Sequence, residues 1–263
     1  MPQLSDITSI LETYAPLELA EDWDNVGLLV GDPDWSVQRL MTCLTITPAT
    51  VREAVEGQAN LIVAHHPLPF HPLKAITTST TAGKMLLELI AHRIAVYSPH
   101  TAFDSAQAGI NQHLAIGLGL REIQPLEPAS DEEPEVGAGR SGIAGEPLTL
   151  SELANRLASF LKSERVQIVG SASQEVSRIG VACGSGGSFL EKAIQAGCDA
   201  LVTGETNYHT CLEAEAQGVG LVLAGHFASE RFALLTLADY LSDQMNDVEV
   251  WASRTDRDPV SSL

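Results

Sequence analysis

Basic residues are scarce in this sequence and form no cluster. There are 15 Lys and Arg against 34 Asp and Glu, so the formal charge of the 263 residues is −19. Proteins hold DNA or RNA by placing Lys and Arg on phosphates, so nucleic-acid binding is not expected. No apolar run approaches the roughly 20 residues of a membrane span, and the first residues lack the pattern of a signal peptide. We therefore expect neither secretion nor a membrane location.

Cysteines are also few and far apart. Cys43, Cys183, Cys198 and Cys211 form no C-x-x-C pair. This spacing indicates neither a disulfide framework nor a thiolate zinc site. The chain is long enough to bury a core without such cross-links, and a reducing, cytoplasmic compartment is expected.

Short apolar runs alternate with helical patterns along the chain, which is typical of an α/β protein with largely parallel or mixed sheets covered by helices. The strands are predicted at 40–46, 61–64, 94–97, 179–183, 200–203 and 221–224. Helices are predicted at 82–92, 189–197 and 228–241, and another begins near Thr149, where Thr149 and Glu152 have the spacing of a capping box. Prolines, glycines and acidic residues at 124–146 indicate a domain boundary or a long surface loop, and the polar tail 254–263 is expected to be loosely ordered.

Histidines and carboxylates gather at the predicted strand ends. His65 and His66 follow one strand, His100 and Asp104 follow a second, and His226 follows a third, with Glu230 one helical turn later. Ligands of α/β proteins bind at the carboxyl ends of parallel strands. A single His at such a position is more often a hydrogen-bonding residue, and a carboxylate there is often a cap. Three such groups at one edge favour a metal site.

Adjacent residues of a regular strand point to opposite sides, so the pair His65 and His66 has two interpretations. Either the strand has ended at His65, or the two imidazoles bind two different ions. Imidazole and carboxylate ligands without thiolate suit zinc, iron, manganese, cobalt or nickel better than magnesium or calcium. His92 and His113 are expected to be surface or packing residues, and His71 is assigned no role.

Two further motifs have a structural and a functional interpretation. The Gly-rich turn at 184–187 lies between a strand and a helix, where backbone amides can bind an anion, but such turns often serve only close packing. Cys183 beside it is a conceivable nucleophile, although buried cysteines are usually inert. The segment 23–28, with Trp23 and Asp24, is interpreted first as a structural loop.

Taken together, these motifs resemble in order those of the YbgI-type dinuclear-metal-centre family, also called Nif-three-like, whose members are often labelled GTP cyclohydrolase type 2 homologs. The resemblance covers nearly the whole chain. It rests on five segments: WDNVGL at 23–28, HHPL at 65–68, HTAFD at 100–104, GSGGS at 184–188 and GHFASE at 225–230.

The resemblance implies a metal-binding α/β protein with two divalent ions per chain. The residues that match the family's ligands are His65, His66, Asp104, His226 and Glu230. His100 matches a family histidine close to the site and is the candidate catalytic residue. The resemblance also implies a Nif-three-like fold without an inserted middle domain, and a toroidal homohexamer built as a trimer of dimers. We predict a metal-bearing lobe at 1–124 plus 220–263 and a second α/β lobe at 125–219.

One departure from the family pattern concerns an acidic residue. Family members often have Gly-Asp followed by an aromatic-His pair, whereas this sequence has Gly204, Glu205 and, further on, Tyr208 and His209. The acid is one methylene longer, which puts the geometry of any histidine that it positions in doubt. The roles of Glu205, of His209 and of the Gly-rich turn are left open.

Two functions follow from these observations. In the first, the protein is a metal-dependent hydrolase in which two ions activate water and His100 moves a proton, acting on a small molecule such as GTP or a phosphoester. In the second, it is a non-catalytic metal-binding or regulatory assembly, since no evident nucleophile or basic clamp for a triphosphate accompanies the ligands.

Overall fold

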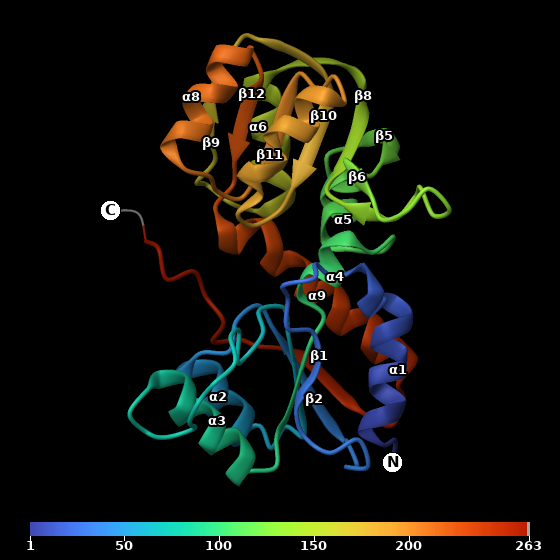
Figure 1. Ribbon diagram of the computed structural model, residues 1–263, viewed down its shortest axis with the longest axis vertical. Coiled ribbons are helices and arrows are strands. Elements are labelled where there is room, and N and C mark those ends of the chain that lie inside the picture. The colour runs from blue at the N-terminus through green and yellow to red at the C-terminus, as the bar shows by residue number, and fades with distance from the viewer. Residues whose placement is uncertain (262–263) are drawn as a thin grey trace. The chain divides into compact units, whose positions relative to one another are not determined.

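The computed structural model describes residues 1–261 and divides into two compact units (Figure 1). Unit 1 comprises Met1–Phe103 and Ala233–Leu263, and unit 2 comprises Asp104–Phe232. The boundaries fall inside helices α4 (His100–Ser105) and α9 (His226–Gln244), not at 124/125 and 219/220 as predicted. The first boundary lies earlier because β5 (Leu120–Gln124) pairs with strand β8 (Arg140–Thr149) of unit 2.

Unit 1 is built on a five-stranded mixed sheet. The strands are β1 (Gly27–Val30), β2 (Arg39–Cys43), β3 (Leu61–Ala64), β4 (Ala95–Ser98) and β13 (Glu249–Ala252). Their order is β1-β4-β3-β2-β13, and only β1 runs antiparallel to its neighbour. Every residue of β3 and β4 is buried, as expected for central parallel strands covered on both faces.

Helices cover both faces of this sheet. Figure 1 shows α2 (Pro48–Glu56) and α3 (Thr81–Ala91) on one side and α1 (Leu4–Tyr14) with the C-terminal part of α9 on the other. A short 3-10 helix, η1 (Leu17–Leu19), follows α1. Helix α2 begins with Thr47 as N-cap and proline as its first residue, and α3 begins after the N-cap Thr80. Both helices pack their apolar faces on β2, β3 and β4.

Unit 2 contains a six-stranded mixed sheet in the order β5-β8-β10-β11-β12-β9. Its remaining strands are β9 (Gln167–Val169), β10 (Glu175–Ala182), β11 (Ala200–Thr203) and β12 (Gly220–Leu223). Strands β10, β11 and β12 are parallel to one another, and β5, β8 and β9 are antiparallel to their partners. The predicted α/β class with mixed sheets covered by helices is confirmed.

The helices of unit 2 are short except for α6 (Leu150–Leu161), and include α5 (Ile110–Gly117), α7 (Leu190–Gln195), α8 (Tyr208–Gln217) and the 3-10 helix η2 (Gly186–Phe189). The predicted capping box of α6 is confirmed: Thr149 Oγ1 accepts a hydrogen bond from the amide of Glu152, and the Glu152 carboxylate accepts one from the amide of Thr149. A core of apolar side chains packs α7 and α8 against β10, β11 and β12.

The segment at 124–146 is more ordered than its composition suggests. Strand β8 already begins at Arg140, and the connection before it contains the two-residue pair β6 (Glu127–Pro128) and β7 (Gly137–Ala138). Arg140 is fully buried and donates to the carbonyls of Gly137 and Gly139, which fixes the end of this connection. The segment at 124–146 is therefore an ordered link that leads into the sheet of unit 2.

The polar tail is also anchored over its first residues, which corrects the expectation of loose order there. The Glu53 carboxylate of α2 accepts hydrogen bonds from Ser253 Oγ and from the amides of Arg254 and Thr255. Asp256 Oδ2 accepts one from the amide of Leu44 at 2.6 Å. The chain is thereby held across the end of β2 in unit 1.

Among the helices of residues 1–261, none has the length and apolar character that crossing a membrane requires.

The Glu53 contacts predict a pH-dependent contribution to stability. Burial disfavours its charge, but the hydrogen bonds from Ser253, Thr255 and Arg254 outweigh burial and lower the pKa of Glu53 to about 2. The stability that the Glu53 carboxylate contributes is therefore present above pH 4.5, the ordinary pKa of a glutamate, and is lost as the pH falls toward 2. We expect Glu53→Gln to lower the free energy of unfolding at pH 7 by about 1 kcal/mol, because solvent screens this partly exposed group.

Tryptophan fluorescence during denaturant unfolding measures this effect in unit 1, because Trp23, Trp35 and Trp251 all belong to that unit. Glu56→Gln, at an exposed position of the same helix, is the matched control. An equal loss in the two variants would show that the anchoring of the tail contributes nothing.

Candidate metal centre

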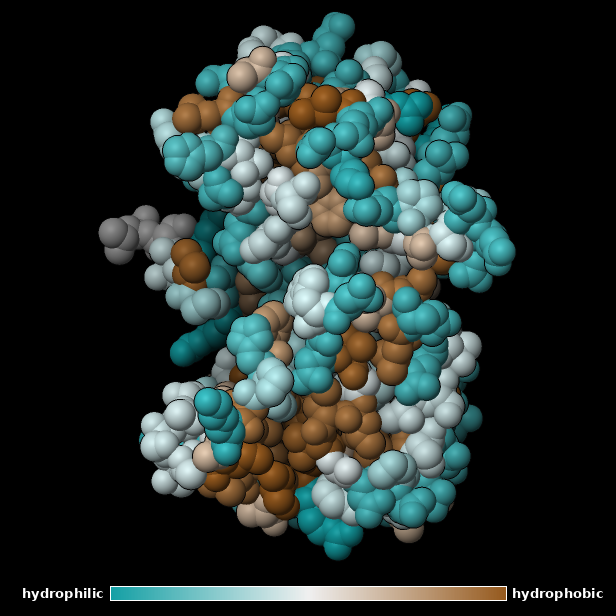
Figure 2. All heavy atoms as spheres, viewed as in Figure 1, coloured by the Kyte–Doolittle hydropathy of each residue, from teal (hydrophilic) through white to brown (hydrophobic). Residues whose placement is uncertain are grey.

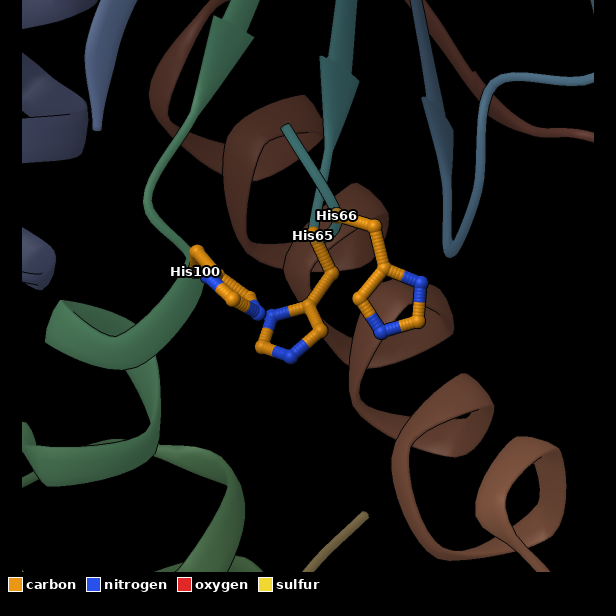
Figure 3. A group of neighbouring side chains, drawn as sticks. All are labelled: His65, His66 and His100. Carbon is orange, nitrogen blue, oxygen red and sulfur yellow. The ribbon is translucent and has the colours of Figure 1, made fainter. Parts of the chain in front are cut away.

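The first part of the site lies at the carboxyl edge of the sheet in unit 1. Strand β3 ends at Ala64, so His65 and His66 follow it, and His100 lies just beyond the end of the neighbouring strand β4. Each imidazole offers one ring nitrogen, and these three nitrogens all lie within 4.8 Å of one another. Figure 3 shows the three rings converging from the two chain segments. Of the two interpretations of the His pair, the structure supports the one in which the strand has ended at His65.

Neighbouring groups hold this histidine cluster in place. Ser98 Oγ donates to the carbonyl of His65 at 2.7 Å, and Thr45, which follows β2, shares a hydrogen bond of 2.7 Å with His66 Nδ1. Hydrogen bonds at Nδ1 fix the orientation and tautomer of metal-binding imidazoles in proteins. His65 is fully buried. The cluster is therefore preorganised by the ends of β2, β3 and β4.

Asp24 is a site residue that the sequence analysis missed, since segment 23–28 was first interpreted as a structural loop. His100 Nδ1 donates to Asp24 Oδ1 at 2.8 Å, and the amide of Thr101 donates to Asp24 Oδ2 at 3.1 Å. Burial opposes the charge of Asp24, but the hydrogen bonds from His100 and Thr101 lower the pKa of Asp24 to about 2. The carboxylate therefore remains ionised at neutral pH.

The backbone of His100 has a φ of +25°, which is unfavourable for a residue with a side chain. The bonds from His100 and Thr101 to Asp24 compensate for this strain at the start of α4. Only the WDN motif of the resemblance pointed to Asp24, because 76 positions separate it from His100.

A second group of candidate ligands lies at the carboxyl edge of the sheet in unit 2. Glu205 follows β11, and His226 follows β12 as the first residue of α9. His226 Nε2 lies 3.1 Å from Glu230 Oε2, which confirms that the i and i+4 side chains meet on one face of the helix. His226 Nδ1 lies 2.9 Å from Glu205 Oε1, so the longer acid of this sequence does reach the histidine.

These carboxylates alter the protonation of His226. Its hydrogen bond with Glu230, followed by the charge of Glu230 and the hydrogen bond with Glu205, raises the pKa of His226 to about 9. The hydrogen bond from His226 in turn lowers the pKa of Glu205. A metal ion bound at Nε2 would compete with the proton at that atom, so metal binding at this pair releases a proton near neutral pH.

Asp104 and Cys183 lie together in unit 2. Cys183 Sγ donates to Asp104 Oδ1 at 3.1 Å. Burial first, and then the charges of Asp104 and Glu230, raise the pKa of Cys183 well above its ordinary value. Burial and the two neighbouring carboxylates favour the neutral thiol, which supports the structural interpretation of Cys183.

Two buried residues outside the predicted set fix the backbone around Asp104. Asn111 Nδ2 donates to the carbonyl of Asp104 at 3.1 Å, and its Oδ1 accepts from the amide of Cys183. Arg140 donates to the carbonyls of Ser105 and Ala106, which directly follow Asp104. Neither residue carried a signal in the sequence, since both act through backbone groups of distant segments.

The Gly-rich turn makes room for Glu230. A Cβ atom at Gly184 would collide with Glu230 Oε1, and Gly184 has a φ of +57°. Its amide donates to Ser229 Oγ at 2.9 Å, and the amide of Gly186 donates to Thr203 Oγ1 at 3.0 Å. The amides of Gly184 and Gly186 are thus engaged with protein hydroxyls, which supports the close-packing interpretation at these two positions.

The other histidines lie outside these two groups. His71 is exposed in the loop after β3, His92 is the exposed C-cap of α3, and His209 is exposed on α8. His113 lies on α5, where burial lowers its pKa.

Both units thus present histidine and carboxylate side chains at the carboxyl ends of parallel strands, which defines the protein as an α/β protein with a candidate metal centre. The family model for Duf34/NIF3 (NGG1p interacting factor 3) matches residues 2–259. The chain belongs to this family.

Curated relatives match over nearly their whole lengths. A protein of Streptomyces coelicolor named "GTP cyclohydrolase 1 type 2 homolog" is 36% identical over 98% of this chain and 94% of its own. A protein of Clostridium acetobutylicum with the same name is 33% identical over 94% of this chain and 92% of its own.

Solved structures match the fold equally well. The Staphylococcus aureus hypothetical protein SA1388 superimposes with a TM-score of 0.90 at 28% identity, covering 99% of both chains. Reduced HcgD from Methanocaldococcus jannaschii superimposes with a TM-score of 0.84 at 26% identity, covering 95% of this chain and 97% of its own.

The packing of Gly184 against Glu230 predicts a specific effect of a single methyl group. Gly184→Ala adds both backbone strain and a clash with the Glu230 carboxylate. Gly197→Ala is the matched control, because Gly197 also has a positive φ, of +71°, but no atom lies within 4 Å of the position that its new methyl group would take. We expect the control to lose about 1 kcal/mol of stability from strain alone and Gly184→Ala to lose at least about 2 kcal/mol.

Denaturant unfolding monitored by circular dichroism measures both variants without added metal. Equal losses would mean that Glu230 moves away from the methyl group at no cost.

Proposed function

We propose that the protein is a divalent-metal-dependent hydrolase with a dinuclear metal centre. The ligands in this proposal are His65, His66, Asp104, His226 and Glu230. The observations that support it are the convergence of the ring nitrogens of His65 and His66 beside His100 and the contact between His226 and Glu230. Helix α4 carries both His100 and Asp104.

The donor set fits transition-metal ions. It consists of imidazole nitrogens and carboxylate oxygens, with Thr45 and Glu205 bonded to the Nδ1 atoms of His66 and His226. Such partners are typical around metal-binding histidines, and this combination suits zinc, iron, manganese, cobalt or nickel. When bound, a pair of divalent ions supplies Lewis-acid activation of water and stabilises negative charge that develops on the substrate.

His100 is the group that we propose to move a proton. The Nδ1–H group of His100 donates a hydrogen bond to the Asp24 carboxylate. The lone pair of the neutral ring is therefore on Nε2. This nitrogen can accept a proton from water and return it to a leaving group. Asp24 also stabilises the imidazolium form, because it remains charged. In this pair, His100 is the catalytic residue and Asp24 is its positioning residue.

The names of the relatives support a small-molecule, nucleotide-type substrate. We propose a GTP cyclohydrolase type 2-like or phosphoester hydrolase reaction, with the same residues serving in either case.

We also propose a cytoplasmic homohexamer, a trimer of dimers. Exposed apolar side chains on α3 and the loop before it support self-association, and they include Leu73, Ile76, Leu87 and Ile90; Figure 2 shows a brown apolar area on one face of unit 1.

Metal content per chain tests the proposed centre. Protein purified without chelator, or stripped and reloaded, is expected to hold two ions per chain by elemental analysis. The double variant His65→Ala, His226→Ala removes one imidazole from each unit and is expected to lose tight binding of both. His209→Ala removes an exposed imidazole of α8 and should retain both ions. Metal content that is unchanged in the double variant would refute the ligand assignment.

The proposed roles of Asp24 and His100 predict a separation of activity from metal binding. We expect His100→Ala to lower kcat for the best substrate by 10²-fold or more, and Asp24→Asn by about tenfold or more, because the neutral amide no longer stabilises the imidazolium. Both should keep their metal content, and Asp22→Asn at an exposed position should behave as the wild type.

Turnover of nucleotides and phosphoesters, with its pH profile, is the measurement. Asp24→Asn should shift the acidic limb of the profile to lower pH, because His100 loses the charge that favours its protonation. A protein that binds two ions but turns over no member of the panel would instead support the non-catalytic metal-binding assembly.

A further inference from the structure

Two aromatic rings are exposed beside His100 and have no place in the mechanism above. Trp23 is 61% exposed and Phe70 is 43% exposed. Their ring centroids lie 6.1 Å apart, and each lies about 6 Å from the imidazole of His100, at 6.1 Å for Trp23 and 6.0 Å for Phe70. We call Trp23 and Phe70 the aromatic platform. Large apolar side chains at such positions expose surface that folding alone would bury.

The loops that carry the aromatic platform are fixed by hydrogen bonds. Asn25 Nδ2 donates to the carbonyl of Pro69 at 2.7 Å and so joins the segment after Trp23 to the segment before Phe70. Asp24 binds His100 and Thr101, and the amide of Glu21 donates to Thr101 Oγ1 at 3.0 Å. A binding surface that is already ordered loses little entropy when a ligand arrives.

The geometry favours one kind of occupant. Indole and phenyl faces bind planar π systems by stacking, and such contacts depend little on which ring is bound. Trp23 has three acidic neighbours along the chain, Glu21, Asp22 and Asp24, and their carboxylates disfavour a phosphate group directly on the platform. Both platform rings meet the imidazole of His100 edge-on, at interplanar angles of 79° and 77°. A ring that carries polar atoms on its edge can stack on the platform and still form hydrogen bonds with His100.

We propose that the aromatic platform binds the planar heteroaromatic ring of the substrate and places that ring beside His100. This inference rests on the proposed function for the identity of the site, and it deepens that function by assigning the class of group that is recognised. Trp23 and Phe70 are then specificity-determining residues, which distinguish heteroaromatic compounds from sugars and simple phosphoesters. A second copy of the chain that covers the rings is the competing occupant.

Calorimetric titration of the protein as purified without chelator tests the platform. The probes are guanosine, cytidine and nicotinamide, with ribose 5-phosphate as the probe that lacks a heteroaromatic ring. We expect saturable binding of at least one heteroaromatic probe and weakening by tenfold or more in both Trp23→Leu and Phe70→Leu. Trp35→Leu is the matched control, because the Trp35 ring lies against the guanidinium of Arg93, 5.1 Å from it, and does not belong to the platform. This variant should bind the probe as the wild type does.

Three further readouts separate the outcomes. Metal content should be unchanged in the platform variants, so lost probe binding is not lost metal. If the wild type binds a heteroaromatic probe through the platform but hydrolyses no substrate, the result would support the platform and refute the hydrolase. Hydrolysis with unchanged affinity in both platform variants would refute the platform and keep the hydrolase.

Absence of binding by all three heteroaromatic probes would overturn the inference. A lower mass of the assembly in both platform variants, measured by light scattering, would also overturn it. The rings would then form an interface between copies of the chain.

Discussion

Parallel strands bring their carboxyl ends to one edge of a sheet, and the candidate site depends on this constraint in both units. In unit 1, β2, β3 and β4 end one or two residues before Thr45, His65 and His100. In unit 2, β11 and β12 end before Glu205 and His226. Residues far apart in the sequence are therefore neighbours at each edge, and the buried strands behind them hold their backbones rigid.

Charged groups at these edges are stabilised by specific partners. Asp24 accepts hydrogen bonds from His100 and Thr101, and Arg140 donates to backbone carbonyls and to Gln112. Burial of a charge is costly unless hydrogen bonds compensate for it, so such groups hold their surroundings in one arrangement. Asp24 thereby fixes the ring of His100, and Arg140 fixes the chain after Asp104. The proposed chemistry depends on these residues as much as on the ligands themselves.

The elements that the sequence predicted best are those with a strong local signal. The strands at 61–64 and 200–203 were predicted at their observed bounds, because each is a continuous apolar run between turn residues. The helix after Thr149 was marked by its capping box. Strands β5, β8 and β9 were not predicted, since polar residues interrupt them and their antiparallel pairing is set by distant partners. The first boundary between the units was misplaced for the same reason.

The candidate site divides in a similar way. His226 and Glu230 were predicted to meet because the spacing of one helical turn fixes their geometry. The contact of Asp24 with His100 and that of Glu205 with His226 could not be predicted, because they join segments that only the fold brings together. Pattern and resemblance identified the residue types, and tertiary structure supplied the partners that orient them.

The assignment of His65 and His66 as metal ligands is tested most directly by tryptophan-monitored unfolding with and without added metal. The three tryptophans report on unit 1 alone. A bound ion raises the unfolding midpoint of the part of the protein that it binds. Metal is expected to raise this midpoint in the wild type and in His209→Ala, and His66→Ala is expected to lose the rise. A full metal-induced rise in His66→Ala would contradict the ligand assignment.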